Sequence, residues 1–413
     1  VIESVRVSKT FTPDQQGDAS GGSVDIVLKG IPDENIFKFK SELKWNSQVR
    51  DRDDFLTYQG GGVNRWGNET GSRAIPPLKS PDAVPGDPLY GVYDYDGQPI
   101  GVSTGNAPQM YKWSVDLGGR HEFDSGVVIG GFATFFYERD ASYFDNGVDD
   151  SYWVTTPGGT ELTPETGGAD GSSVGPGNDF NTGLYDITEG VESVQWGGLA
   201  TGGIQWEAWG RHEIDAAYLY TRTTDDVATL AEDTRGKQWF TETFYDVPYE
   251  LDDPDNPGNI RENQLAAPYL RTQTLNYTER TVESTQFSGD HAWDASYLDI
   301  GIDDVIQFTG IEFDWTGSFG RATQYEPDKR QFGSKWSPGY TLELVPGFPQ
   351  FDLPVSSFYS PFKPDANFTI GNLQHIYKNI DETSRQLSLN LTLPFEQWTG
   401  DGGYVKLGSF IDN

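Results

Sequence analysis

The sequence predicts an all-β protein, an antiparallel transmembrane β-barrel. Of its 413 residues, 14% are aromatic and 49 are glycine, with a single methionine, a composition typical of strands and turns. Long segments alternate apolar and polar residues with the period of two that a strand requires. Their connections alternate between a few residues and about 40–50 residues, an asymmetry typical of outer-membrane barrels.

Composition also excludes several classes of function. The net charge of -34 argues against a nucleic-acid partner. The absence of cysteine excludes thiolate catalysis, cysteine-ligated zinc and disulfides. No apolar run reaches the ~18 residues of a membrane helix. Because no catalytic triad order, P-loop or carboxylate pair stands out among 63 acidic residues, we predict no enzyme, no catalytic residues and no cofactor.

The first element is a pair of short strands. Residues 1–7 and 23–28 have strand patterns, and the small-residue run Gly17–Gly22 lies between them. Gly30 and the break Ile31-Pro32 follow, since proline ends a strand. We predict a small packed unit over residues 1–31, joined to a large sheet over residues 32–413.

The large sheet begins with residues 36–46, which alternate between an apolar and a lysine-rich face. Residues 54–58 are predicted to extend that strand, and residues 60–110 to form a long loop rich in Gly, Pro and Asp. Residues 111–117 alternate again, and 127–139 are apolar on both faces.

A second long loop is predicted over residues 141–188. The clearest strand follows at 191–209, where Trp196, Ile204 and Trp206 share one face. A tight turn leads to 213–223, and a third long loop comes next. Further strands are predicted at 271–289, 308–324, 373–393 and 403–411, with another long loop at 325–372. The barrel portion therefore has about nine strands, longer than the usual ~5–6 residues.

Three of the four histidines occupy equivalent positions at tight turns. Gly119–Asp124 matches Gly210–Asp215, and Gly289–Asp294 is a looser copy. Because equivalent turns around a rim are spread out, we predict a turn or interfacial role for His121, His212, His291 and His375, and no metal site.

Two Asp-rich stretches, Asp145–Asp150 and Asp252–Asn259, offer oxygen ligands that calcium could use. Neither has the spacing of the helix-loop-helix calcium site, so solvated surface loops are the favoured interpretation. For Glu279 and Arg280 a structural ion pair is the favoured interpretation, and a contact to substrate is the alternative. The aromatic residues of the long loops could stack on ring-bearing ligands or pack against their own loops, and both interpretations stay open: Trp66, Tyr90, Tyr93, Tyr95 and Trp153.

A membrane barrel explains the pattern better than a soluble β-sandwich or β-helix. A soluble sandwich has turns of similar length at both ends, whereas these loops are asymmetric. Hydrocarbon requires every strand to be fully paired and the outward face to be apolar. The polar faces of the strands would then line the lumen, and the long acidic loops would be extracellular.

Several segments resemble those of TonB-dependent outer-membrane receptors. Residues 2–7 (IESVRV) resemble a strand near the end of that family's plug domain, and residues 17–26 (GDASGGSVDI) resemble the plug's closing segment. Further similarities to one branch of the family lie in its barrel: residues 54–58, 277–280, 326–330 and 393–395, and Trp398. The resemblance extends from residue 1 to about residue 408.

The resemblance implies a domain division. Residues 1–31 would be the C-terminal end of a plug domain. Residues 32–413 would be the N-terminal part of an outer-membrane barrel, incomplete against the ~22 strands of such transporters. The signal segment, the TonB box, most of the plug and the C-terminal strands are expected to lie outside this sequence.

The implied function is energy-coupled uptake of a scarce, bulky ligand across the bacterial outer membrane. The implied partners are the TonB energy-transducing complex, outer-membrane lipid and an extracellular ligand. That ligand could be a siderophore, a vitamin, a glycan or a metal complex, and the ligand-binding residues are unknown. The alternatives are a passive porin, a surface ligand-binding barrel, and a soluble secreted β protein.

Overall fold

The computed structural model describes the chain in segments, and its described part contains strands, turns and bends only. The described residues are 2–8, 23–28, 30–69, 71–150, 152–154, 157–160, 162–164, 184–233, 270–294, 301–302, 305–337, 357–359 and 373–413. Within these segments no helix has the length and apolarity needed to cross a membrane.

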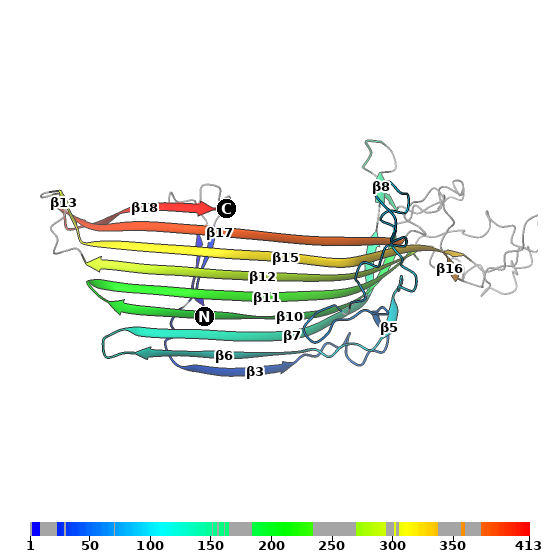
Figure 1. Ribbon diagram of the computed structural model, residues 1–413, viewed down its shortest axis with the longest axis horizontal. Helices are drawn as coiled ribbons and strands as arrows, with labels where there is room; N and C mark the ends of the chain where they lie inside the picture. The colour runs from blue at the N-terminus through cyan, green and yellow to red at the C-terminus, as the bar shows by residue number, and fades with distance from the viewer. Residues whose placement is uncertain are drawn as a thin grey trace, which may run out of the picture.

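Nine long antiparallel strands form one sheet, with each strand hydrogen-bonded to the one before it (Figure 1). In spatial order they are β3 (Ile36–Leu43), β6 (Tyr111–Glu122), β7 (Val128–Asp150), β10 (Leu184–Glu207), β11 (Gly210–Asp233), β12 (Leu270–Asp294), β15 (Gly310–Ser337), β17 (Leu373–Gln397) and β18 (Gly402–Asp412). This meander confirms the predicted all-β antiparallel class, and each predicted sheet strand is present.

Short strands decorate the long ones. β1 (Ile2–Ser8) and β2 (Ser23–Leu28) pair as a separate hairpin. The other short strands are β4 (Phe55–Thr57), β5 (Ser103–Gly105), β8 (Tyr152–Val154), β9 (Leu162–Pro164), β13 (Gly301–Ile302), β14 (Ile306–Phe308) and β16 (Ser357–Tyr359). The residues predicted to extend β3 pair with β5 instead, so that part of the prediction is wrong.

The long strands run further than the sequence predicts. β7 continues to Asp150, where it still pairs with β10, and β15 continues to Ser337. Residues 141–150 and 325–337 were predicted as loop because they are polar. Polar side chains are compatible with a strand whose backbone is paired and whose faces meet water, so composition alone hides these extensions.

The described sheet is open. β3 lies at one edge and β18 lies beyond β17 at the other, on opposite sides of the sheet in Figure 1. The predicted assignment of this sheet to an incomplete barrel, with residues 1–31 as the end of a plug, is therefore not confirmed by the described architecture.

The two faces of the sheet differ in chemistry. Strand side chains alternate between faces, so the pairing registers assign every residue of the sheet to one face. We call one of them the apolar face; it carries Phe135, Trp196 and Phe287. We call the other the polar face; it carries Gln195 and Gln286.

Next to the short turns, the apolar face has an uncharged band. In β7, β12 and β15 the first five positions on this face carry no Asp, Glu, Lys or Arg, and in β11 and β17 the first six carry none; the next position is charged in each strand. These runs are 129–137 in β7, 210–220 in β11, 285–293 in β12, 311–319 in β15 and 387–397 in β17. In β10 the uncharged run is longer and covers 194–206. Because neighbouring runs pair with each other, they form one continuous band.

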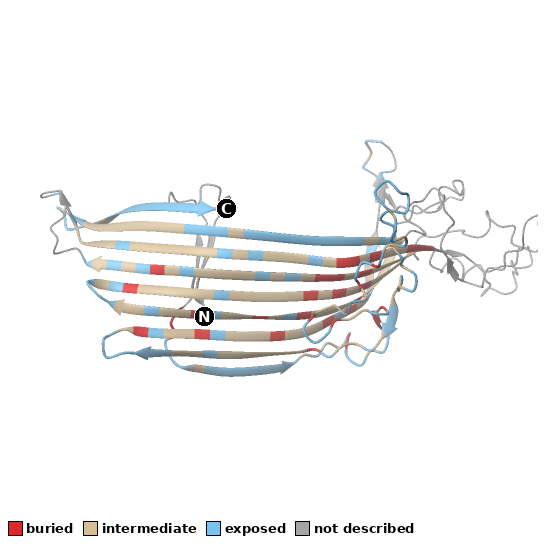
Figure 2. Cartoon of the chain, viewed as in Figure 1, coloured by how far each residue is buried: buried red, intermediate tan, exposed pale blue. Residues whose placement is uncertain are grey.

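The opposite end of the apolar face is covered by protein. We call residues 46–69 and 71–110, which connect β3 to β6, the strap. Its Val49, Phe55 and Leu56 form a buried core with Ala228 and Leu275 of the sheet. Figure 2 shows several of the buried positions gathered at this end of the strands. The long strands therefore contribute to a buried core beneath the strap.

Candidate functional site

A tight turn within the strap, residues 64–68, lies directly on the sheet. The Asn64 side chain accepts hydrogen bonds from the backbone N–H groups of Trp66 (2.8 Å) and Asn68 (3.0 Å). Gly67 has φ of +75°, and a Cβ there would lie 2.7 Å from Thr224 Oγ1. Only glycine therefore lets the turn approach β11 this closely.

Three consecutive carbonyl groups of this turn accept hydrogen bonds from three different strands. The pairs are Tyr137 Oη to Arg65 O (2.6 Å), Trp196 Nε1 to Trp66 O (3.0 Å) and Tyr277 Oη to Gly67 O (2.8 Å). The Trp66 ring packs edge-on against Tyr137 and Trp196, with centroids 5.8 and 5.7 Å away. The turn is thus clamped across β7, β10 and β12, and Thr224 of β11 lies beneath it.

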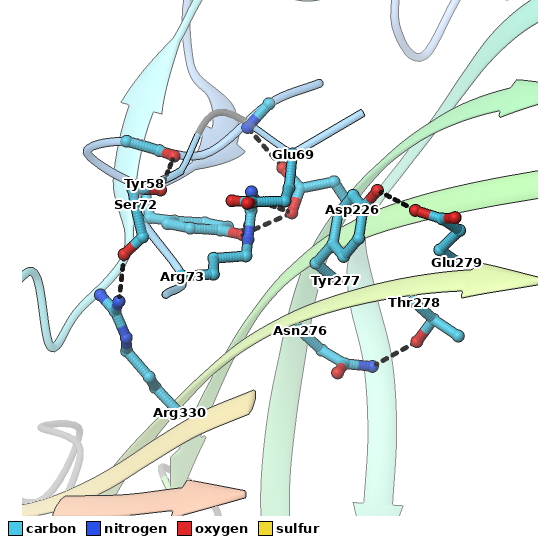
Figure 3. A network of polar contacts seen from close by, with 12 residues as sticks. Tyr58, Glu69, Ser72, Arg73, Asp226, Asn276, Tyr277, Thr278, Glu279 and Arg330 are labelled. Carbon is cyan, nitrogen blue, oxygen red and sulfur yellow. Dashed lines mark hydrogen bonds and ion pairs between the residues drawn. The ribbon is translucent and has the colours of Figure 1, made fainter. Parts of the chain in front are cut away.

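A buried ion pair attaches the strap beside this turn (Figure 3). Arg73 Nη2 lies 2.7 Å from Asp226 Oδ1, and the two side chains are only 3% and 4% exposed. Tyr58 donates its hydroxyl proton to Asp226 and accepts hydrogen bonds from Arg73. Burial, followed by the negative charge of Asp226, raises the pKa of Tyr58 well above its ordinary value. The phenol therefore stays protonated and serves as a neutral bridge between the two charges.

A second buried group holds the far part of the strap to β15 and β17. Arg330 donates to Pro99 O (2.8 Å) and Ser72 O (3.0 Å). Its charge is balanced by Asp328, 2.6 Å away, and Asp328 also pairs with His375. The His375 ring stacks on Tyr95 of the strap with centroids 3.7 Å apart.

The polar face carries a shallow hollow of about 460 Å³. Its wall is formed by Asn46, Glu138, Asp140, Ala141, Ser142, Ser193, Gln195, Thr223 and Asp225. Lys44 pairs with both Glu138 and Asp140, and Arg280 pairs with Asp225 at 3.2 Å. These acidic groups are already matched by cations, so the hollow is a balanced polar surface.

The structure changes the prediction for the histidines. His212 and His291, expected to be spread apart, face each other across β11 and β12 with their Nδ1 atoms 3.2 Å apart. They meet because the two equivalent motifs lie on adjacent antiparallel strands in register. His121 instead packs edge-on against Phe123, and His375 lies beside the strap.

The other candidate residues have mixed outcomes. Asp145–Asp150 belongs to β7 and is not a loop, and Asp145 lies 3.3 Å from Arg52. Asp252–Asn259 lies outside the described residues. Among the residues that the structure describes, no group of three His, Asp or Glu side chains is arranged for a metal ion.

Glu279 and Arg280 form structural ion pairs, as predicted, but on opposite faces. Glu279 pairs with Arg222 at 2.6 Å on the apolar face. Arg280 pairs with Asp225 on the polar face.

Three of the loop aromatics, Trp66, Tyr93 and Tyr95, contact other side chains. Trp66 packs on the sheet, and Tyr93 packs edge-on against Tyr95 with centroids 6.3 Å apart. Tyr90 is half exposed, and the Trp153 side chain lies outside the described residues. The sequence signals the strap turn through Asn64 and Gly67, but it gives no sign of which strands receive it.

Comparison with known proteins adds no identification: no family model, no curated protein and no solved structure matches this chain. The fold and the site therefore define the chain only as a two-faced antiparallel β-sheet with a clamped first loop.

Proposed function

We propose that this chain forms part of the wall of an outer-membrane β-barrel, with its apolar face toward lipid. The observation that carries the proposal is the uncharged band. Outside β10 its runs are nine to eleven residues long, for example Ile129 to Tyr137, and they match the ~9–11 residues of a transmembrane strand. Exposed apolar side chains within it, such as Phe287 at 52% and Phe319 at 41%, require an apolar environment.

The aromatic residues support the same placement. Trp196 and Trp206 lie near the two ends of the band on β10 and are ten residues apart. Ten residues of strand extend ~33 Å, and a tilt of ~40° reduces this to a height of ~25 Å. That height equals the apolar band of outer-membrane barrels, whose two edges are marked by aromatic belts.

Charges resume on the apolar face immediately beyond the band. Arg139 pairs with Glu192 there, and Arg222 pairs with Glu279. The strap covers this same zone, so it would lie on the outer wall above the membrane. Lipid hydrocarbon cannot satisfy unpaired backbone groups, and the proposed wall therefore needs further strands along β3 and β18.

The polar face would line the lumen, and the segment after the β1–β2 hairpin supports a plug there. Ile31 is buried, and its side chain lies against Gly130 and Gly203 of the polar face, where an added Cβ would come within 2.7 and 3.0 Å of it. Gly30 sits so close to Asp215 that a side chain has no room. The chain preceding β3 is thus attached to the polar side of the sheet.

We propose, on this basis and the sequence resemblance, a TonB-dependent receptor that imports a scarce, bulky ligand. Residues 1–31 would be the end of its plug and residues 32–413 part of its barrel. The TonB complex would supply energy, and the ligand would be a siderophore, vitamin, glycan or metal complex. A tether fixed on the polar face favours a plugged importer over an open porin.

The test is genetic. The gene is deleted in the native bacterium, alone and together with TonB, and growth is compared on limiting iron complexes, vitamins and glycans. The proposal predicts one nutrient for which each single deletion gives the same defect and the double deletion gives no more. A growth defect that follows deletion of the gene but not deletion of TonB would identify a passive porin instead.

A further inference from the structure

The histidine pair at the turn end of the apolar face has a geometry that fixes its protons. We infer that His212 and His291 form a hydrogen-bond chain with one proton order, in which both rings are neutral, and that this chain is a pH-sensitive latch between two hairpins. The first hairpin consists of β10 and β11, and the second consists of β12 and β15.

The two ends of the chain determine the tautomers. Trp315 Nε1 lies 3.3 Å from His291 Nε2, and an indole N–H can only donate. His212 Nε2 lies 2.9 Å from Ala208 O, and a carbonyl can only accept. His291 Nε2 therefore carries a lone pair, and His212 Nε2 carries a proton.

The proton positions in the middle of the hydrogen-bond chain follow from these two ends. A neutral imidazole has one N–H, so His291 carries its proton on Nδ1. That proton points to His212 Nδ1, 3.2 Å away, which must accept with its lone pair. The order is Trp315 to His291 to His212 to Ala208 O, and every donor meets one acceptor.

The surroundings favour the neutral state. Aromatic rings enclose the pair: Trp206 and Trp293 lie 5.3 and 5.1 Å from the His212 ring, and Phe313 stacks 6.4 Å from His291. The ionisable groups on the adjacent positions all belong to the polar face of the same strands. They are Glu207, Arg211, Glu213, Asp290, Glu312 and Asp314.

Protonation is incompatible with this order. An added proton on His291 Nε2 would meet the Trp315 N–H, and one on His212 Nδ1 would meet the His291 N–H. Each case converts a hydrogen bond into two opposed donors. Acidification therefore opens the link between β11 and β12, or between β12 and β15, at the turn end.

The direct test is the tautomer of each ring. Long-range proton–nitrogen NMR spectra of the chain in detergent micelles at about pH 7.5, assigned by single-histidine substitutions, report which nitrogen carries hydrogen. We expect His212 as the Nε2–H form and His291 as the Nδ1–H form. A His291 ring in the Nε2–H form, or either ring as a cation, would overturn the inference.

Two tryptophan variants provide a matched comparison. W315F removes the donor to His291, so the Nδ1–H preference of that ring is expected to disappear. W293F removes a ring that only packs against the pair, so both tautomers should persist. Equal spectra for the two variants would contradict the inferred hydrogen-bond chain.

The latch itself is tested by melting. The wild-type melting temperature is expected to fall between about pH 7.5 and about pH 5. H291N can donate an N–H near the Nδ1 position and does not titrate, and its amide can turn the oxygen toward a protonated His212 Nδ1, so most of that fall should vanish. An undiminished fall in H291N would show that other groups sense the acid; if H291N does not fold, W315F is used in its place.

Discussion

Asp226 is the residue on which attachment of the strap depends most. Its carboxylate neutralises Arg73, accepts the Tyr58 hydroxyl and accepts the backbone N–H of Gly62. Removing it would leave the Arg73 guanidinium buried without a counter-charge. A pair in this position gives little net stability over apolar packing, but breaking it is costly.

We therefore expect Asp226→Ala to lower the free energy of unfolding by ~3–5 kcal/mol, measured by urea titration in micelles. Asp381→Ala is the control, because Asp381 pairs with Arg321 at 2.6 Å in an exposed setting and should give no measurable change. Equal effects of the two substitutions would mean that the strap is not held by the buried pair.

At the same scale, sequence reasoning identified residues better than it identified contacts. It assigned Glu279 and Arg280 to ion pairs, but it could not choose their partners, which lie 57 and 55 positions away. His212 and His291 were expected to be apart because equivalent turns around a barrel rim are spread out, and the register that brings them together cannot be derived from either strand alone. Pairing distant strands requires the three-dimensional register.

At the scale of elements, the strap turn depends on one glycine. Gly67 combines φ of +75° with an approach to Thr224, whereas Gly71 has φ of +90° with nothing within 4 Å of an added Cβ. At both positions the positive φ would strain any residue with a side chain. Only at Gly67 would the side chain also clash with a neighbour.

We expect Gly67→Ala to destabilise the chain by ~2–4 kcal/mol, from ~1–2 kcal/mol of left-handed strain plus the clash. Gly71→Ala should cost only ~1–2 kcal/mol of strain. Thermal unfolding measures the destabilisation in both variants, with the fluorescence of Trp66, which packs against Tyr137 and Trp196, as the signal. A Gly71 variant as unstable as the Gly67 variant would argue that the turn does not rest on β11.

The strands themselves were predictable because alternation with a period of two survives in a single sequence. Their ends were not, since β7 and β15 continue through polar residues whose pairing decides the structure. The position of the strap on the sheet could not be predicted either, because its Gly- and Pro-rich composition indicates a loop but not where that loop packs.

At the scale of the molecule, the proposed membrane wall requires that lipid surround the uncharged band. Ala200 lies near the middle of the band on β10, and Gln195 of the same strand lies on the polar face. In lipid, Ala200→Arg should cost ~2–4 kcal/mol, as a charge does at the bilayer midplane.

Gln195→Arg should have little effect, because that position is exposed on the polar face. Unfolding titrations in lipid bilayers compare the two variants directly. If arginine at Ala200 were tolerated as well as at Gln195, the band would not face hydrocarbon.

The most direct measurement is spin-label accessibility along β10. The chain has no cysteine, so single cysteines at successive positions from 198 to 205 can each carry a nitroxide after reconstitution into bilayers. We expect a period of two: even positions collide with lipid-soluble oxygen, and the odd positions 199 and 205 collide with a water-soluble nickel chelate. Thr201 is buried and Gly203 lies against Ile31, so labels at these two odd positions are shielded from both reagents. Accessibility to the nickel chelate at every position, or the opposite alternation, would contradict a membrane-facing apolar face.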